Sequence, residues 1–389
     1  MTSFRISAAI ALGLTSSIGT FGAPAAAGQP AAARPVTLWV LNEWSGSALP
    51  INTATKKAGK PIKVDTPFAE AITPDGRKLY VSGFSNLLTV NTATGRIIRR
   101  TKIKGGPAQL AMLPDGRTVY VVSNAGLVPI NVATGRVGRP IKVNQGPDQP
   151  EFFAVTPDSK ILYAVDDTIV IPVNTRTNKP GKPIKTGYNG LGMLVTPNGK
   201  TGYVLGGINT VIPVNLRTAK AGKPIRVGPY SADVWAMAIT PDGKTVYAVN
   251  RNGTVVPITT ATNRAGKPIK IGGEPDSIAI TPNGKTAYVT TDHAVYPINI
   301  ATNKAGKPIT APRLDPAMTA ITPDGKTAWI TSVEEVDRNG VNSPAPGFVL
   351  PVSTKTNRPG KPIKVGEANH CLVIRPWHSG KAMGPLTCG

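Results

Sequence analysis

The sequence predicts an all-β protein assembled from one repeated unit, and three observations lead to this prediction. A Thr-Pro-Asp-Gly turn recurs seven times in variant forms, at intervals of 40 to 44 residues. The segments between these turns are short apolar runs rich in Val and Ile, which favour strands. Helical periodicity is not found after the N-terminal segment. A period of about 40 residues, with four short strands in each unit, is typical of a β-propeller.

Each unit reads as four antiparallel strands, A to D, illustrated here by residues 277–281 for strand A, 245–250 for B, 254–260 for C and 267–272 for D. In the turn between A and B, Pro presets φ and Gly accepts the left-handed conformation. A Gly-Lys-Pro-Ile motif recurs on strand D, which we expect to be outermost. Lys and Pro on an edge strand block sideways pairing with another molecule. The same motif could also form a basic belt that binds anionic polymers.

The two ends of the repeat predict how the ring closes. Residues 37–65 supply strands B, C and D without a strand A, whereas the segment around Cys371 reads as a strand A, with Pro376 in place of the turn proline. An unclosed ring would leave unpaired strand edges. We therefore predict eight blades, one of them shared by both ends of the chain, with seven blades and frayed ends as the alternative. Extra residues at 333–347 fall between strands B and C of the seventh unit.

The N-terminal segment is typical of a secretory signal. Residues 1–27 contain Arg5, then an apolar run, then an Ala-rich stretch, and we expect cleavage after Ala27 or, alternatively, after Ala33. The apolar run is too short to span a bilayer. We expect residues 28–36 to be a flexible linker and 37–389 to be a single propeller domain. The expected location is secreted, either extracellular or associated with the cell envelope.

The chain has two cysteines, Cys371 and Cys388. Export makes a disulfide between them the expected state. A bridge closing a loop of that length would stabilise the fold by about 3 kcal/mol in the chain-entropy model.

The strand-B segments resemble a known family. The runs "KTAYVTT", "GRKLYVSG" and "GRTVYVVS" each follow a Pro-Asp/Asn-Gly turn and precede an "NTATG"-like segment. They resemble the YVTN family of β-propeller repeat proteins over residues 37–376. The resemblance implies a secreted or surface protein with the propeller fold found in lactonases and streptogramin lyases. The family usually suggests seven blades, from which the count of eight departs.

The formal net charge is +23, and its distribution predicts partners. We expect most acidic residues to gather on the face that carries the B–C and D–A loops, and Lys and Arg to cover the opposite face and the outer strand. A basic surface of this kind predicts binding to anionic cell-envelope polymers or to another protein. No motif for specific nucleic-acid recognition is present, and we expect a monomer.

Sequence motifs do not identify a catalytic residue, a metal site or a cofactor. There is no nucleophile-elbow or zinc-protease pattern, and the three histidines supply little acid–base chemistry. The prediction is a non-enzymatic scaffold for binding or surface interaction; the alternative is a lactonase-type or lyase-type enzyme acting at the acidic loop face. The predicted binding residues lie in loops that depart from the repeat, and they are Asp148, Glu151, Tyr188, Tyr230, Asp233, His293, Asp337 and His370.

Overall fold

The structure is a computed structural model that describes residues 37–42, 45–143, 152–187, 190–206, 208–229, 233–310, 314–334, 346–367 and 369–374. Of these, it describes the backbone alone at 314–315, 333–334, 367 and 369–374. The predicted signal segment, the linker and Cys388 lie outside the described residues, so the signal and the disulfide stay predictions. No helix in the described part of the chain is long and apolar enough to cross a membrane.

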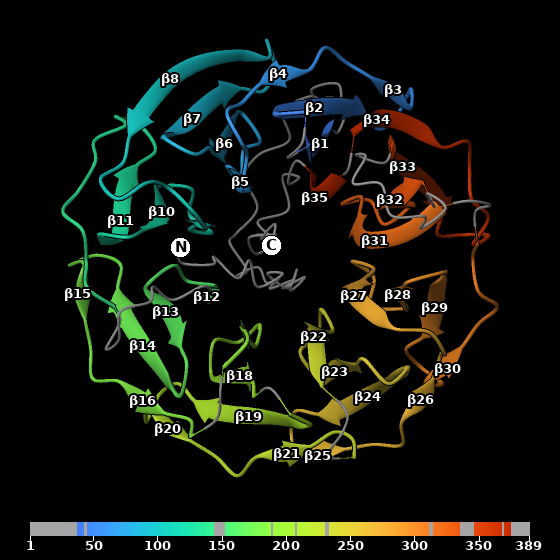
Figure 1. Ribbon diagram of the computed structural model, residues 1–389. Helices are drawn as coiled ribbons and strands as arrows, with labels where there is room; N and C mark the ends of the chain where they lie inside the picture. Colours follow the sequence, from blue (N-terminus) through green and yellow to red (C-terminus); the bar gives the residue numbers. More distant parts are fainter. Residues whose placement is uncertain are drawn as a thin grey trace, which may run out of the picture.

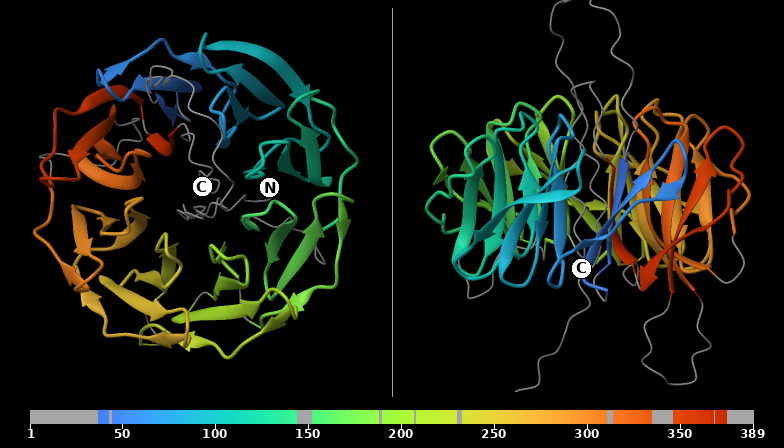
Figure 2. Two further views of the ribbon diagram at one scale, coloured as in Figure 1. Left: turned by 180° about the vertical axis from the view of Figure 1, so that it is seen from behind. Right: turned by 90° about the horizontal axis from the view of Figure 1, so that it is seen from above.

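The described strands form eight separate antiparallel sheets arranged in a ring around a central axis (Figure 1). Seen from the edge, the ring is a disc (Figure 2). The prediction of eight blades is therefore confirmed. We number the blades 1 to 8 along the chain, starting from the sheet that contains β1 (Thr37–Asn42).

Strand A of each blade is innermost. From blade 1 to blade 8 these strands are β35 (Asn369–Ile374), β5 (Ala69–Ile72), β9 (Leu110–Met112), β12 (Phe152–Val155), β17 (Met193–Val195), β22 (Val234–Ile239), β27 (Pro275–Ile280) and β31 (Leu314–Ile321). The strands in position B are β1, β6 (Lys78–Ser82), β10 (Thr118–Ser123), β13 (Ile161–Asp166), β18 (Thr201–Leu205), β23 (Thr245–Asn250), β28 (Thr286–Thr291) and β32 (Thr327–Glu334).

Strand C lies third from the axis in every blade. These strands are β2 (Ser47–Asn52), β7 (Asn86–Asn91), β11 (Gly126–Asn131), β14 (Ile169–Asn174), β19 (Thr210–Asn215), β24 (Thr254–Thr259), β29 (Val295–Asn299) and β33 (Pro346–Ser353). The insertion predicted at 333–347 falls between β32 and β33, as expected.

Strand D forms the rim and is interrupted in most blades. Its pieces are β3 (Lys57–Ala58) and β4 (Ile62–Lys63), β8 (Arg96–Lys102), β15 (Lys179–Pro180) and β16 (Ile184–Lys185), β20 (Lys220–Ala221) and β21 (Ile225–Arg226), β25 (Arg264–Ala265) and β26 (Ile269–Lys270), β30 (Lys304–Ala305), and β34 (Ile363–Glu367). Blade 3 has three named strands, and isolated bridges continue it outward at Val137 and Ile141.

The ring closes as the sequence predicted. β35, the last described strand, pairs antiparallel with β1, with Leu38 opposite Ile374 and Leu41 opposite Cys371. On either side of β1, alternate side chains join different cores, because successive residues of a strand point to opposite faces. Leu38 packs with Trp329 of blade 8, whereas Trp39 packs with Leu79 of blade 2.

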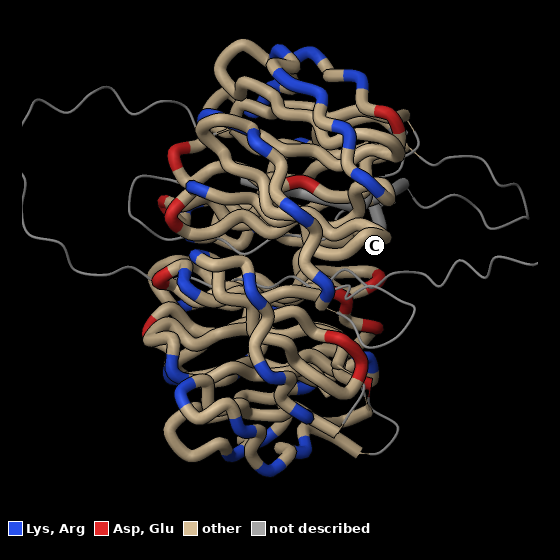
Figure 3. The backbone as a smooth tube through the Cα atoms, turned by 90° about the vertical axis from the view of Figure 1, so that its left-hand side faces the viewer, with Lys and Arg blue, Asp and Glu red and all other residues tan. Residues whose placement is uncertain are grey.

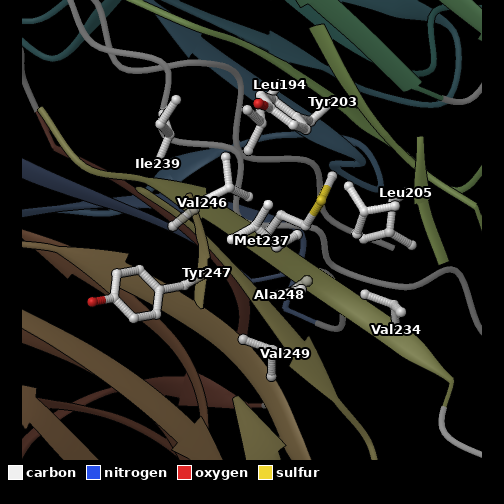
Figure 4. Packing of buried hydrophobic residues seen from close by; sticks show 14 of the residues in the cluster. Leu194, Tyr203, Leu205, Val234, Met237, Ile239, Val246, Tyr247, Ala248 and Val249 are labelled. Carbon is white, nitrogen blue, oxygen red and sulfur yellow. The ribbon is translucent and has the colours of Figure 1, made fainter. Parts of the chain in front are cut away.

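The core lies between the blades. The largest cluster consists of buried apolar side chains of blades 4 to 7. Figure 4 shows part of it, where side chains of β17 and β18 lie near those of β22 and β23. Met237 of strand A and Tyr203 of strand B are both fully buried there. Because both faces of each sheet are covered by neighbouring blades, the strands read as near-continuous apolar runs.

A proline on strand C explains the interruption of strand D. In seven blades this proline lies opposite the strand-B aromatic residue, as Pro257 lies opposite Tyr247. The strand-D glycine donates its N–H to the proline carbonyl, at 2.7 Å from Gly266 to Pro257. A Cβ on Gly266 would approach the Pro257 ring to 3.1 Å, so any other residue at this position would crowd the proline where strand D passes over it. Blade 2 has Thr89 instead of the proline, and its β8 is continuous.

A hydrogen bond between neighbouring blades recurs at four interfaces. The strand-B tyrosine of one blade donates its hydroxyl to an asparagine Oδ1 in the C–D turn of the next, at 2.6 Å each time; the pairs are Tyr120–Asn178, Tyr203–Asn263, Tyr247–Asn303 and Tyr288–Asn357. Each asparagine has a positive φ between 53° and 56°, which asparagine tolerates better than most residues. Burial raises the pKa of each of these tyrosines to about 12, so they stay neutral donors at physiological pH.

We expect Tyr247→Phe to lower the free energy of unfolding by about 1 kcal/mol, because Asn303 loses its donor. Urea unfolding followed by circular dichroism measures this. The matched control is Tyr163→Phe, since Tyr163 occupies the same strand position in blade 4 but makes no such bond among the described residues. Equal losses in the two variants would show that the hydrogen bond contributes nothing.

Gly266→Ala should destabilise the fold by about 1 to 3 kcal/mol, because the new methyl group is forced against Pro257. In the Pro257→Ala background the same substitution should cost clearly less. A double-mutant cycle in urea measures the coupling. Additive effects would contradict the steric explanation.

Candidate functional site on the loop face of blades 6 and 7

The disc has two faces that differ in their loops. One, the A–B face, carries the A–B and C–D turns; the other, the B–C face, carries the B–C turns and the D–A connections. Acidic residues lie on both faces, and Lys and Arg are spread between them (Figure 3). The acids on the A–B face are few and belong to the repeated turns, whereas those on the B–C face belong to loops that differ among blades.

The A–B face acids are parts of the turns themselves. Thr240 donates its hydroxyl to Asp242 at 2.6 Å, and the same carboxylate accepts the Lys244 N–H at 3.0 Å. Burial raises the pKa of Asp242, but these hydrogen bonds and the Lys244 charge outweigh it, and the net pKa is lowered. The Lys244 ammonium lies 3.7 Å from the carboxylate. Such acids are engaged in structure and are poor candidates for ligand binding.

The structure describes only part of the predicted binding set. Its members outside the described residues are Asp148, Glu151, Tyr188, Tyr230 and Asp337. His370 is described by its backbone alone. Asp233 and His293 are fully described, and both lie on the B–C face, in the loops of blades 6 and 7.

Bulges mark the B–C ends of the innermost strands. In β22 the register with β23 shifts between Val234 and Ala236, so Trp235 is the extra residue. In β27 the register with β28 shifts between Pro275 and Ser277, so Asp276 is the extra residue there. A further shift opposite Leu41 and Asn42 places the backbone of His370 at the equivalent point of β35. Bulges re-aim side chains and are frequent beside functional sites.

Around the first two bulges the structure brings together seven residues that we call the blade 6–7 cluster: Asp233, Trp235, Arg251, Glu274, Asp276, Asp292 and His293. The Arg251 guanidinium lies 3.6 Å from the centroid of the Trp235 ring. The backbone N–H of Arg251 donates to the Asp233 carbonyl at 3.0 Å. This contact holds the B–C turn of blade 6 against the start of β22.

The blade 7 half of the cluster is acidic. The Asp292 carboxylate accepts the Glu274 N–H at 2.9 Å, and its second oxygen lies 2.9 Å from His293 Nε2. Burial raises the pKa of Asp276; the Arg251 charge lowers it, and the charges of Asp292 and Glu274 raise it further, so the net pKa is above 3.8. Burial and the neighbouring carboxylates thus favour the protonated form of Asp276.

Several members of the cluster were not among the predicted binding residues. Phe152 and Phe153, the aromatic residues at the start of strand A in blade 4, are buried, but Trp235 at the start of strand A in blade 6 is only partly buried. No motif in the sequence marks Arg251, which directly follows strand B of blade 6. Its stacking on Trp235 depends on a contact between two segments of that blade. The sequence feature that could have located them is that the segments "GPYSADVW" and "GGEPDS" differ from the repeat.

The arrangement suits reversible binding of a polar ligand. It offers an exposed imidazole, a cation held on an aromatic face and several carboxylates, one of which, Asp276, has a raised pKa. Within the described residues, no group of three or more His, Cys, Asp or Glu side chains is placed to hold a metal ion.

Similar solved structures share the fold at low identity. The dihydro-heme d1 dehydrogenase NirN, in complex with DHE, matches with a TM-score of 0.71 and 13% identity over 87% of this chain and 74% of that chain. A functionally unknown protein from Desulfotomaculum acetoxidans matches with a TM-score of 0.56 and 15% identity over 87% and 98% of the two chains. Hydrazine synthase from Kuenenia stuttgartiensis matches with a TM-score of 0.50 and 20% identity, over 68% and 97%.

No family model matches the chain, and no curated protein does. The similar structures thus support the propeller fold alone, and the resemblance to YVTN repeats stays an interpretation of the strand-B motifs.

We expect Asp276→Asn to stabilise the fold at neutral pH. A carboxyl whose folded pKa is raised binds a proton more tightly in the folded than in the unfolded state, so its ionisation lowers stability as pH rises. The gain should be largest at pH 7 and should shrink as the pH falls toward the ordinary value of 3.8. Thermal melting of both proteins across this range measures it; a gain independent of pH would contradict the shift.

Proposed function

We propose that this protein is a secreted, non-enzymatic propeller scaffold that binds anionic polymers of the cell envelope through its rim. The observation that supports this most strongly is the exposed basic sequence on the outermost strand. In six blades the motif reads Gly-Lys/Arg-Pro-Ile-Lys/Arg, and blade 7 has Thr310 in the last position. Both basic positions are exposed, as at Lys267 and Lys270, while the isoleucine between them is largely buried.

Blade 2 contributes cations by a different sequence. β8 and the residue pair that follows it carry exposed Arg96, Arg99, Arg100, Lys102 and Lys104. The basic rim therefore continues around all eight blades, although one of them lacks the motif.

These rim cations are available to a partner. The ion pairs between described residues involve the A–B turn aspartates and the Asp292–His293 pair, and none involves a strand-D Lys or Arg. Cations repeated at regular angular intervals suit a flexible chain that carries a charge on each unit. Such binding would be driven by counterion release and would weaken steeply with salt.

The rim residues can protect the sheet edges and bind a polymer at the same time. Lys and Pro on the rim also prevent edge-to-edge pairing between molecules. A scaffold that must stay separate while coating a polymer needs both properties.

A second candidate function is an enzyme of lactonase or lyase type acting at the B–C face. The observation that favours it is Asp276, whose pKa is raised beside the Asp292–His293 pair, because carboxyls of this kind can act as general acids. The rim would then serve to localise the enzyme.

The rim proposal is tested by elution from immobilised linear polyphosphate with increasing salt. We expect a triple variant, Lys63→Gln with Lys185→Gln and Lys270→Gln, to elute at lower salt than the unchanged protein. Its plot of log affinity against log salt should flatten by roughly 0.7 to 0.9 per lost contact.

The matched control neutralises three lysines that lie next to turn aspartates on the A–B face: Lys160→Gln, Lys244→Gln and Lys326→Gln. The charge removed is equal, but these side chains are already paired. Equal elution of the two triple variants, or retention that ignores salt, would refute binding through the rim.

A further inference from the structure

At one interface between neighbouring blades the tyrosine–asparagine hydrogen bond is missing, and no other group takes the place of the asparagine among the described residues. The C–D turn position that holds the asparagine has a positive φ in every blade, and four blades have Lys56, Gly95, Gly135 or Ala219 there instead. Opposite Gly95 and Lys56 stand the larger aromatics Trp39 and Trp329. Opposite Ala219 of blade 5 stands Tyr163 of blade 4, with no hydrogen-bond partner among the described residues.

The remaining interface, between blades 2 and 3, is filled differently. The Arg99 side chain lies over Gly135, where a Cβ would meet the guanidinium carbon at 2.5 Å. The same arginine is close enough to Tyr80 for its charge to act on the pKa of that hydroxyl. Tyr163 is therefore the strand-B tyrosine left with neither an asparagine nor an arginine across the interface.

A cavity of about 840 Å³ opens at this position on the A–B face. Three successive A–B turns, from blades 4, 5 and 6, form one side of it with Pro157, Pro197 and Pro241. Tyr163 and Leu216 line it from the interface. The apolar part of its lining thus includes three prolines and Leu216, and Tyr163 is the aromatic residue among the lining residues.

The charges around the cavity do not cancel. Asp158 and Asp242 are bonded within their own turns and lie 3.1 and 3.7 Å from Lys160 and Lys244. Lys200 follows Asn198 rather than an aspartate; the Asn198 side chain accepts the Thr196 hydroxyl at 2.8 Å and the Lys200 backbone N–H at 2.9 Å, but it carries no charge to pair with the Lys200 ammonium. Arg217 also lines the cavity, and neither it nor Lys200 has an ion pair with a described residue.

We propose that this cavity is a binding site for a small organic anion. The apolar part of the ligand would pack on the prolines and Leu216, and its phosphate or carboxylate would lie between Lys200 and Arg217. The Tyr163 hydroxyl, which is neutral at physiological pH, would donate a hydrogen bond to the ligand. This site is separate from the rim and from the blade 6–7 cluster.

Isothermal titration with phenyl phosphate, benzoate and inorganic phosphate tests the proposal. We expect saturable binding of at least one phenyl compound, about tenfold tighter than inorganic phosphate. The tighter of the two identifies the preferred anionic group. Absence of saturable binding by both phenyl compounds would overturn the proposal.

Three variants locate the binding. Arg217→Gln should weaken it about fivefold or more by removing one charge. Ala219→Asn should restore the repeated bond to Tyr163, raise the melting temperature and reduce binding to a similar extent. Lys285→Gln is the matched control, because Lys285 follows Asn283 in blade 7 as Lys200 follows Asn198, and it lies outside the cavity.

The same variants can also disprove the proposed site. Equal loss in Lys285→Gln and Arg217→Gln would assign the binding to nonspecific charge and overturn the site. If Ala219→Asn does not fold, Arg217→Gln against Lys285→Gln still decides. The rim triple variant should bind phenyl phosphate normally, so this result is independent of the polymer test.

Discussion

The pairing of β1 with β35 is the constraint on which the rest of the structure depends. A ring of sheets has no free face only when its first and last blades meet, and here one blade takes its innermost strand from the C-terminal end and three strands from the N-terminal end. Once that strand pair forms, Leu38 and Trp39 are buried against different neighbours. The apolar runs of all the strands then become interior, because every sheet is covered on both sides.

Within the ring, residues of different strands depend on one another. The strand-C proline requires glycine on strand D, since any Cβ there would meet the proline ring. The strand-B tyrosine and the asparagine of the next blade form a second linked pair. Blade 2 lacks both the proline and the glycine, which shows that the two features change together. Ala219 departs from this second pair, and Tyr163 opposite it lines the cavity on the A–B face.

The molecule separates its charges by structural role. Aspartates on the A–B face stabilise turns through hydrogen bonds from a threonine and from the chain itself. Rim lysines are exposed and unpaired among the described residues, and the carboxylates of the blade 6–7 cluster are arranged around Arg251. The formal net charge of the chain is +23, and the strand-D cations form no ion pair with a described acidic residue. This separation explains how a strongly basic chain can also present an acidic loop cluster.

The sequence by itself determined the strands, the turns, the eight blades and the closure, because these follow from local periodicity and from counting strands at the two ends. Only the tertiary structure decided which residues of different blades meet. Tyr247 and Asn303 are 56 residues apart and lie in neighbouring blades. The sequence located Asp233 and His293 on one face, but it gave no sign that Arg251, Glu274 and Asp292 would lie close enough for their charges to act on Asp276, or that Tyr163 would line a cavity. Such contacts depend on how neighbouring blades pack against each other. The repeat of about 40 residues defines each blade but does not say which side chains of two blades meet.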